Sequence, residues 1–178
     1  MTGIINKQYP IGKFKFPQRI DEESIKSWIH TLEEQPKKLK FICNRLSDEE
    51  LKYQYRSGGW NIRQIIHHIA DSHINSYVRY KWTLTEDTPM IKAYQEDSWA
   101  TLPDYEAPVE MSLSLLEALH RRWTLLLHML QPSDYERELI HPANNRHISL
   151  GSLTSMYAWH GNHHIAHVEL ALQEKIIE

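Results

Sequence analysis

The chain has 178 residues, of which 41% are hydrophobic and 24% are charged. These values are typical of a globular protein, and the length predicts a single domain over residues 1–178 with a sizeable core. The net charge of −3 excludes the basic surface that nucleic-acid binding requires. No segment has the apolar length of a membrane span or signal peptide, and the single cysteine, Cys43, suits a reducing compartment. We therefore expect a cytoplasmic protein with neither a nucleic-acid nor a membrane partner.

The first part of the chain predicts an extended arm followed by a long helix. Residues 1–19 contain two prolines and two glycines, which predict the arm. Apolar residues at helical spacing predict a helix over residues 22–46. Pro36 lies inside this span, and because proline lacks a backbone N–H we expect it to kink or break the helix.

Two capping boxes mark the next helix starts. Ser47 and Glu50 have the spacing of such a box and predict a short helix directly after Ser47. Asn61 and Gln64 resemble a second box, and it begins a pattern that predicts a long helix over residues 61–84.

The second half of the chain predicts a long loop, two further long helices and a small hairpin. Residues 85–108 contain three prolines and several aromatic residues, which predict an ordered loop. Periodicity predicts helices over residues 111–130 and 150–176, and the segment 133–150 between them predicts the hairpin. Four long amphipathic helices in one domain predict an all-α fold, a four-helix bundle.

Four of the twelve histidines lie close together in the last predicted helix. His160 and His164 are four residues apart and share one face of that helix, near the centre of its apolar side. Burying two imidazoles there costs desolvation, and a shared metal ion would satisfy both at once. We therefore predict that His160 and His164 bind a metal. His163 and His167 lie further round the helix, where the periodicity favours no single role.

A metal site of this kind needs a third protein ligand, and the second long helix offers His67, His68 and His73. His73 points toward the apolar face, whereas His67 and His68 flank that face on opposite sides. Periodicity alone does not choose among them. The remaining histidines are scattered and are interpreted as background: His30, His120, His128, His141 and His147.

We also consider the roles of three charged residues near the predicted ligands. Asp71 and Glu169 could accept hydrogen bonds from ligand imidazoles, although solvent-exposed helix carboxylates are the commoner case. Arg79 is expected to be a surface or salt-bridge arginine rather than a residue that lines a substrate cavity.

Two motifs contain the histidines in question. Trp60-Asn-Ile-Arg-Gln-Ile-Ile-His-His68 resembles the tryptophan-led helix start of the DinB-like superfamily, in which a metal-binding histidine follows eight residues after the tryptophan. His160-x-x-His163-His164 is similar to the family's second motif, whose first and last histidines bind metal. The resemblance covers nearly the whole chain and is greatest to the YfiT group of metal-dependent hydrolases, which are related to bacillithiol S-transferases. It implies His68, His160 and His164 as ligands, with His67 as the alternative to His68.

The resemblance further implies an up-down-down-up bundle, one divalent metal ion, for which we favour zinc or nickel, and a homodimer. The chain departs from the family pattern at Gly161, where an acidic residue is usual. It also departs at residues 165–167, where Arg-Gly-Gln is usual. Neither departure changes a ligand, but both leave the roles of those neighbouring positions open.

Two reactions suit three neutral imidazoles around a divalent ion. Such a centre can lower the pKa of bound water to about 7, or bind a thiol as its thiolate. Gly161 replaces the glutamate of a His-Glu-x-x-His protease motif, and no other carboxylate base is evident, so no catalytic side chain is identified. We expect a metal-dependent hydrolase in the broad sense. The favoured chemistry is transfer of a low-molecular-weight thiol to an electrophilic small molecule, and the alternative is a bundle that binds a metal or small ligand without catalysis.

Overall fold

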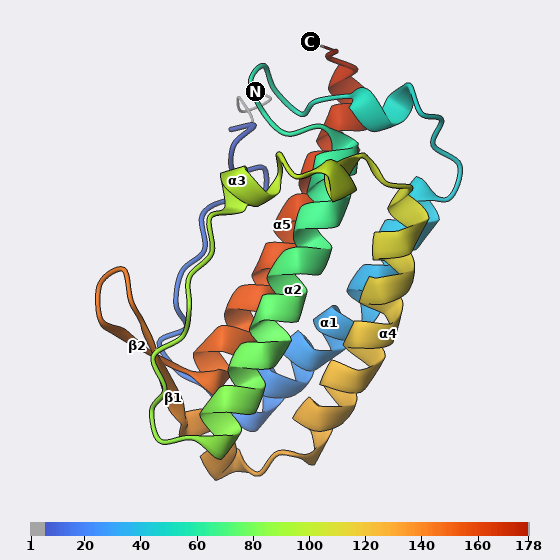
Figure 1. The fold of residues 1–178 in the computed structure, drawn as a ribbon. Coiled ribbons are helices and arrows are strands. Elements are labelled where there is room, and N and C mark those ends of the chain that lie inside the picture. The colour runs from blue at the N-terminus through green and yellow to red at the C-terminus, as the bar shows by residue number, and fades with distance from the viewer. Residues whose placement is uncertain (1–5, 178) are drawn as a thin grey trace.

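Four long helices form the body of the protein in the computed structural model, which describes residues 6–177 (Figure 1). They are α1 (Glu22–Cys43), α2 (Ile62–Thr85), α4 (Val109–Met129) and α5 (Leu150–Glu174). Helices α1 and α5 run in one direction along the bundle, and α2 and α4 run in the other. Both α1 and α2 pack against α4 and α5. The predicted up-down-down-up four-helix bundle is confirmed, and residues 1–5 of the predicted arm lie outside the described residues.

Both predicted capping boxes are present. The Asn61 side chain accepts a hydrogen bond from the Gln64 backbone N–H at 2.8 Å, and the Gln64 side chain accepts one from the Asn61 N–H at 3.0 Å. This reciprocal pair satisfies two free donors at the start of α2. Ser47 and Glu50 pair in the same way, but the helix that follows is only a 3₁₀ turn, Glu50–Lys52.

Helix α1 continues through Pro36 without a break and ends at Cys43, three residues earlier than predicted. Of the two expected outcomes, a kink or a break, the break was therefore wrong. Because Pro36 has no N–H, the carbonyl of Leu32, four residues earlier, cannot receive its usual helical hydrogen bond. That carbonyl instead accepts a hydrogen bond from Nδ1 of His120 on α4, at 2.6 Å.

A long connection crosses the bundle between α2 and α4. Since these two helices run in the same direction, residues 86–108 must return along the full length of the bundle (Figure 1). This segment is ordered, as predicted, and contains α3 (Glu96–Trp99) and a 3₁₀ turn at Pro103–Glu106. It pairs with the predicted hairpin, formed by β1 (Glu138–His141) and β2 (Arg146–Ser149), through the backbone of Ile91 and Ile140.

The buried apolar residues form two clusters, and the His73 ring lies next to residues of both. One cluster includes Leu39, Ile69 and Leu116, and the other includes Leu32, Tyr80, Trp123 and Tyr157. The His73 ring packs against Trp123 and Tyr157 on one side and lines a small cavity with Leu39, Ile69 and Leu116 on the other. In the described part of the chain, no helix combines the length and hydropathy of a membrane span.

Candidate metal centre

Three histidines from two antiparallel helices meet in the half of the bundle where α2 begins. One ring nitrogen from each of His68, His160 and His164 lies within 4.8 Å of the others. The ring centroids of His160 and His164 are 4.5 Å apart, and those of His68 lie 5.4 and 4.7 Å from them. The four-residue spacing on α5 places its two rings on one face, and α2 supplies the third ring from the facing helix. The structure therefore brings together the three residues that the family resemblance implies.

These imidazoles are neutral at pH 7. Desolvation by burial is the main cause, and it lowers the pKa of His68 to about 4 and the pKa values of His160 and His164 well below their ordinary value. The mutual repulsion of their positive charges acts in the same direction for His160 and His164. A neutral imidazole keeps one nitrogen lone pair, which is the form that binds a metal.

The donor set fits a divalent transition metal. Three imidazole nitrogens suit zinc, nickel, copper or iron(II) and leave coordination positions for a substrate. The buried Nδ1 atom of His68 has no hydrogen-bond partner within residues 6–177, which is costly unless another group satisfies that nitrogen. Across the same residues, no carboxylate forms an ion pair or hydrogen bond with any of the three rings.

His67 lies on the opposite side of α2 and faces α4. Its Nδ1 atom is 2.7 Å from the Ser112 hydroxyl oxygen, and its Nε2 atom is 3.1 Å from the Ala107 carbonyl oxygen. Both nitrogens of His67 are therefore already satisfied. The structure does not bring this residue to the three-histidine cluster.

The other two histidines in this part of α5, His163 and His167, lie beside the ring of His164. The His163 ring stacks on Trp159 at 4.4 Å, and the His167 ring stacks on Tyr55 at 4.0 Å between centroids. Nδ1 of His167 lies 3.5 Å from Nδ1 of His164. Both side chains are buried, so neither is a surface residue.

His120, interpreted as background, is not among the three clustered rings but is buried in the core beside them. Its side chain is 2% exposed, and its Nε2 atom lies 2.7 Å from Nδ1 of His73. His73, as predicted, points inward, and its Nε2 atom lies 3.2 Å from Nδ1 of His160. Helical spacing in the sequence indicates the burial of His120, because it shares a face of α4 with the buried residues Leu113, Leu116, Trp123 and Leu127.

The remaining background histidines lie away from the cluster. His30 and His128 pair with Glu33, and His147 pairs with Glu138, all at exposed positions. His141 lies in β1, where it is partly exposed.

The carboxylates expected near the ligands have other partners. Asp71 accepts a hydrogen bond from the Tyr105 hydroxyl at 2.8 Å, and Glu169 pairs with Lys38 at 2.9 Å. The expectation for Arg79 was wrong, since this side chain is buried and has no ion-pair partner within residues 6–177. It donates hydrogen bonds to the Tyr157 hydroxyl and to the Lys92 carbonyl.

Gly161, the departure from the family pattern, faces α1. A Cβ atom at this position would overlap the Gln35 side chain. Gln35 in turn donates a hydrogen bond from Nε2 to the Ala158 carbonyl at 2.7 Å. The buried Gln35 side chain of α1 therefore occupies the space that a side chain at position 161, beside His160, would need.

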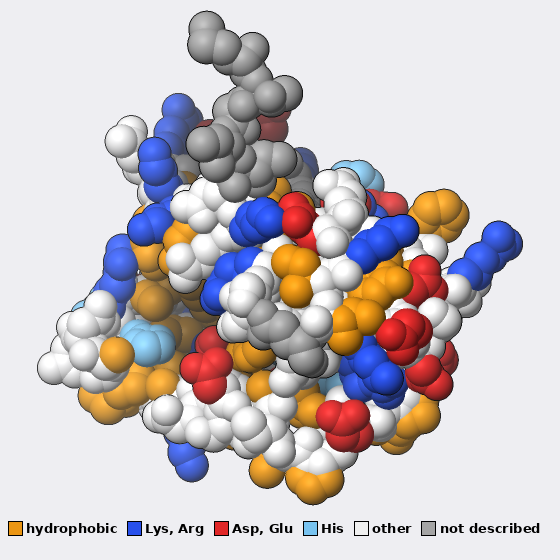
Figure 2. All heavy atoms as spheres, turned by 90° about the horizontal axis from the view of Figure 1, so that it is seen from above, with side chains coloured by type: hydrophobic (Ala, Val, Ile, Leu, Met, Phe, Trp, Pro, Cys, Tyr) orange, Lys and Arg blue, Asp and Glu red, His pale blue; other side chains and the backbone are white. Residues whose placement is uncertain are grey.

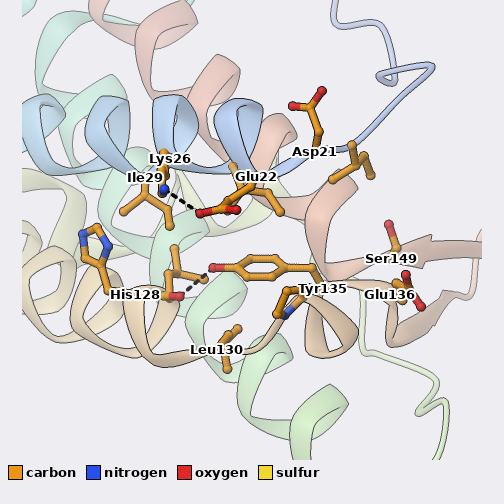
Figure 3. Close-up of a pocket in the computed structure, with 13 residues that line it drawn as sticks. Asp21, Glu22, Lys26, Ile29, His128, Leu130, Tyr135, Glu136 and Ser149 are labelled. Atoms are coloured by element: carbon orange, nitrogen blue, oxygen red, sulfur yellow. Dashed lines mark hydrogen bonds and ion pairs between the residues drawn. The ribbon is translucent and has the colours of Figure 1, made fainter.

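The pocket in Figure 3 lies at the other end of the bundle, where α1 begins and α4 ends. It has a volume of about 540 Å³ and is lined by apolar side chains such as Ile29 and by the charged pair Glu22 and Lys26. Its Tyr135 hydroxyl donates to the Leu127 carbonyl at 2.6 Å. No group of potential metal ligands converges in it among the described residues. Seen from above, the opposite end of the molecule carries interspersed basic and acidic side chains (Figure 2).

Comparisons with known proteins agree with this architecture. The family described as the DinB superfamily matches residues 31–168. Two relatives carry the name "Putative metal-dependent hydrolase". The one from Oceanobacillus iheyensis is 48% identical over 171 residues, covering 96% of this chain and 99% of its own length. The one from Bacillus mycoides is 44% identical over 169 residues, covering 95% and 96%.

Solved structures extend the comparison to the fold. YfiT from Bacillus subtilis, described as a probable metal-dependent hydrolase with an unusual four-helix bundle topology, matches with a TM-score of 0.93 and 42% identity, covering 98% of this chain and 100% of its own. A mycothiol-dependent maleylpyruvate isomerase matches with a TM-score of 0.65 and 14% identity, covering 81% of this chain and 60% of its own, which shows a shared fold alone. On the family match and the relatives' identity over nearly their whole length, this chain belongs to the DinB superfamily.

Proposed function

We propose that His68, His160 and His164 bind one divalent metal ion, zinc or nickel, and that the chain is a metal-dependent enzyme acting on a small molecule. The observation that carries this proposal is the convergence of three neutral imidazoles, one with an unpartnered buried nitrogen. The names of the relatives and of YfiT support a metal-dependent hydrolase in the broad sense. Homodimer formation and a cytoplasmic location remain part of the proposal.

The reaction we favour is transfer of a low-molecular-weight thiol, such as a bacillithiol-like compound, to an electrophilic small molecule. When bound, a divalent ion supplies Lewis acidity, which lowers the pKa of a coordinated water or thiol. Hydrolysis additionally profits from a carboxylate base near the nucleophile, and no carboxylate contacts the three histidines within residues 6–177. A thiol has a much lower pKa than water and does not depend on such a base.

Aromatic side chains line the centre, where His68 is buried and His160 and His164 are half-buried. The Trp60 ring packs against the rings of His68 and His164, with centroids 4.5 and 6.4 Å apart. Trp159 and His163 form a stacked pair beside it. Aromatic surroundings suit an apolar electrophile, and they strengthen the interaction of the imidazole lone pairs with a cation by lowering the local dielectric constant.

Metal analysis of the purified protein tests the site. We expect about one ion per chain in the wild type and nearly none in His160→Ala. His67→Ala is the matched control, because it removes a buried imidazole next to His68 that contacts Ser112 instead. Equal metal content in His160→Ala and wild type would refute the site. Metal loss in His67→Ala but not in His68→Ala would show that His67, and not His68, is the third ligand.

A substrate panel separates the reaction classes. The metal-loaded protein is incubated with monochlorobimane and a series of small thiols, and in parallel with ester and amide substrates. Thiol conjugation that is lost in His160→Ala supports S-transfer. Ester or amide cleavage with the same dependence supports hydrolysis in its place, and inactivity in both assays with a full metal content supports the non-catalytic binding protein.

A further inference from the structure

A row of three hydrogen-bonded imidazoles crosses the interior of the bundle and touches all four long helices. It begins at His160 on α5, whose Nδ1 lies 3.2 Å from Nε2 of His73 on α2. Nδ1 of His73 lies 2.7 Å from Nε2 of His120 on α4. Nδ1 of His120 lies 2.6 Å from the Leu32 carbonyl oxygen on α1. The row thus connects a proposed metal ligand to a backbone carbonyl on the far side of the core.

The carbonyl at the end of this row is available because of Pro36. In a regular helix the N–H of residue 36 would donate to the carbonyl of residue 32, and proline has no N–H to donate. A buried carbonyl without a partner is costly, and His120 supplies the missing donor. The proline that sequence patterning marks as a helix breaker therefore creates an acceptor in the middle of α1.

The carbonyl fixes the direction of every hydrogen bond in the row. A carbonyl oxygen only accepts, so Nδ1 of His120 must carry a hydrogen. In a neutral ring Nε2 of His120 then carries none and accepts from Nδ1 of His73. By the same reasoning Nε2 of His73 accepts from Nδ1 of His160. The reverse direction would place a lone pair of His120 against the carbonyl oxygen at 2.6 Å.

Burial keeps the rings in the row neutral. Desolvation is the largest cause of the low pKa of His120, which falls to about 4, and of His73, whose pKa lies well below its ordinary value. The rings that pack against them are those of Trp123, Tyr157 and the neighbouring histidines. No carboxylate within residues 6–177 forms an ion pair or hydrogen bond with either ring, and desolvation of His120 outweighs the Leu32 carbonyl, which favours the charged form.

We propose that His73 and His120, anchored by the Leu32 carbonyl that Pro36 leaves free, are positioning residues that hold His160 as its Nδ1–H tautomer and present its Nε2 lone pair to the metal. This inference rests on the proposed metal site. A hydrogen bond that fixes the tautomer and orientation of a ligand imidazole increases metal affinity, commonly by 10- to 100-fold. Here that support extends through two further rings, so a substitution in α1 or α4 reaches the metal without touching a ligand.

The first test is the tautomer of each ring in the metal-free wild-type protein, measured from the ¹⁵N chemical shifts of the imidazoles. We expect hydrogen on Nδ1 in His160, His73 and His120. A hydrogen on Nε2 of His160 or of His120 would overturn the proposal. Because this measurement needs no substitution, it holds even if a variant of the core fails to fold.

The second test compares metal affinities by competition with a chromophoric chelator, using Zn²⁺ and Ni²⁺. His73→Phe removes the acceptor of His160, and we expect Kd to rise by about 10- to 100-fold. His67→Phe is the matched control on the same helix, with a buried ring that bonds to Ser112 rather than to His160. Folded His73→Phe with a Kd within about twofold of the control would contradict the proposal.

Pro36→Ala distinguishes a positioning role from a merely structural one, because the two roles predict different effects on metal binding. Alanine favours helix more than proline does, so the helix itself should become more stable. The restored N–H competes with His120 for the Leu32 carbonyl, and we expect weaker metal binding and a mixture of His160 tautomers. Unchanged affinity and a pure Nδ1–H tautomer in Pro36→Ala would remove the proline from the proposal.

The two proposals fail in different ways. If His160→Ala binds metal as well as the wild type, the site itself is wrong. If His160→Ala loses the metal while His73→Phe and Pro36→Ala keep full affinity, the site stands and the positioning role fails.

Discussion

The two ends of the bundle differ in whether their polar side chains have partners. The pocket at the end where α1 begins is roomy, and its charged side chains have simple local partners, such as Lys26 with Glu22 at 2.6 Å (Figure 3). The histidine centre in the other half contains one buried and two half-buried rings, and none of the three has a carboxylate partner within residues 6–177. The pKa of Glu22 is lowered chiefly by its hydrogen bond to Lys26, whereas that of His68 is lowered by burial alone.

We therefore place the proposed functional site by its unpartnered polar groups rather than by the volume of a pocket. Polar groups that satisfy one another at the surface need no ligand, and the pocket at the α1 end is explained without one. Buried nitrogens that remain unpartnered carry a free-energy cost, and a metal ion is the group that would remove it. Four predictions test the contrast, and we give them in order of decreasing effect.

Metal addition should stabilise the protein through the histidine centre alone. At a free metal concentration about 1,000 times Kd, binding to the native state contributes about 4 kcal/mol to the free energy of unfolding. Thermal or urea unfolding with and without Zn²⁺ measures this difference. We expect His164→Ala to lose it and Glu136→Gln, in the pocket at the α1 end, to keep it. If Glu136→Gln lost the metal-dependent stabilisation, the ion would bind at the α1 end and not at the histidine centre.

Acidification should destabilise the metal-free protein through its buried rings. The pKa of His120 is about 4 in the folded state and about 6.5 in the unfolded chain, so the unfolded chain binds more protons between these values. The free energy of unfolding is therefore full above pH 6.5 and falls by about 3 kcal/mol from this residue as the pH drops to 4. Urea titrations across this range measure the slope, and His120→Gln should flatten it. An equal slope in both proteins would contradict the assignment.

Gly161→Ala should destabilise the fold by about 1–2 kcal/mol. The added Cβ overlaps Gln35, and overpacking costs more than the roughly 1 kcal/mol that alanine gains in helix propensity. Chemical denaturation of the single variants and of Gly161→Ala with Gln35→Ala forms a double-mutant cycle. We expect the second substitution to recover much of the loss, and strictly additive effects would mean that the overlap is not the cause.

Tyr135→Phe should cost about 1 kcal/mol, the loss of one buried hydrogen bond to the Leu127 carbonyl. Its effect should be confined to stability. Metal affinity measured by chelator competition should equal that of the wild type, since Tyr135 lies in the pocket at the α1 end. A change in Kd would show that the two ends are coupled.

Local patterns were sufficient to predict most of the fold. The Asn61 and Gln64 capping box marks the start of α2, and periodicity predicts the four long helices to within a few residues of their ends. Pro36 misled the prediction because a missing helical hydrogen bond is tolerated when another donor reaches the free carbonyl. That donor, His120, lies 88 residues along the chain from Leu32, whose carbonyl it reaches.

The arrangement of the histidines depends on packing that no local pattern contains. His67 and His68 are neighbours that flank the apolar face of α2, and which of them meets α5 is decided by the side on which α5 lies. Periodicity could not choose between them, and the family resemblance favoured His68. Whether these residues bind metal stays a prediction. The hydrogen bond between His73 and His120 could not be predicted from the pattern of either helix, because it depends on how α2 and α4 are positioned relative to each other along the bundle axis.

The Gln35 side chain of α1 fills the space that the missing side chain of Gly161 leaves on α5, and we call this space the notch. The fit of Gln35 in the notch sets the axial register of α1 against α5. Sliding one helix past the other by a single residue, about 1.5 Å, would drive Gln35 into the side chains on either side of the notch. Gln35 and Leu32 lie on the same helix within one turn, so the notch also holds the Leu32 carbonyl at the height of His120. The geometry around the proposed metal thus depends on a position where a side chain is missing, and we expect substitutions that shift α1 lengthwise to disturb the centre without contacting it.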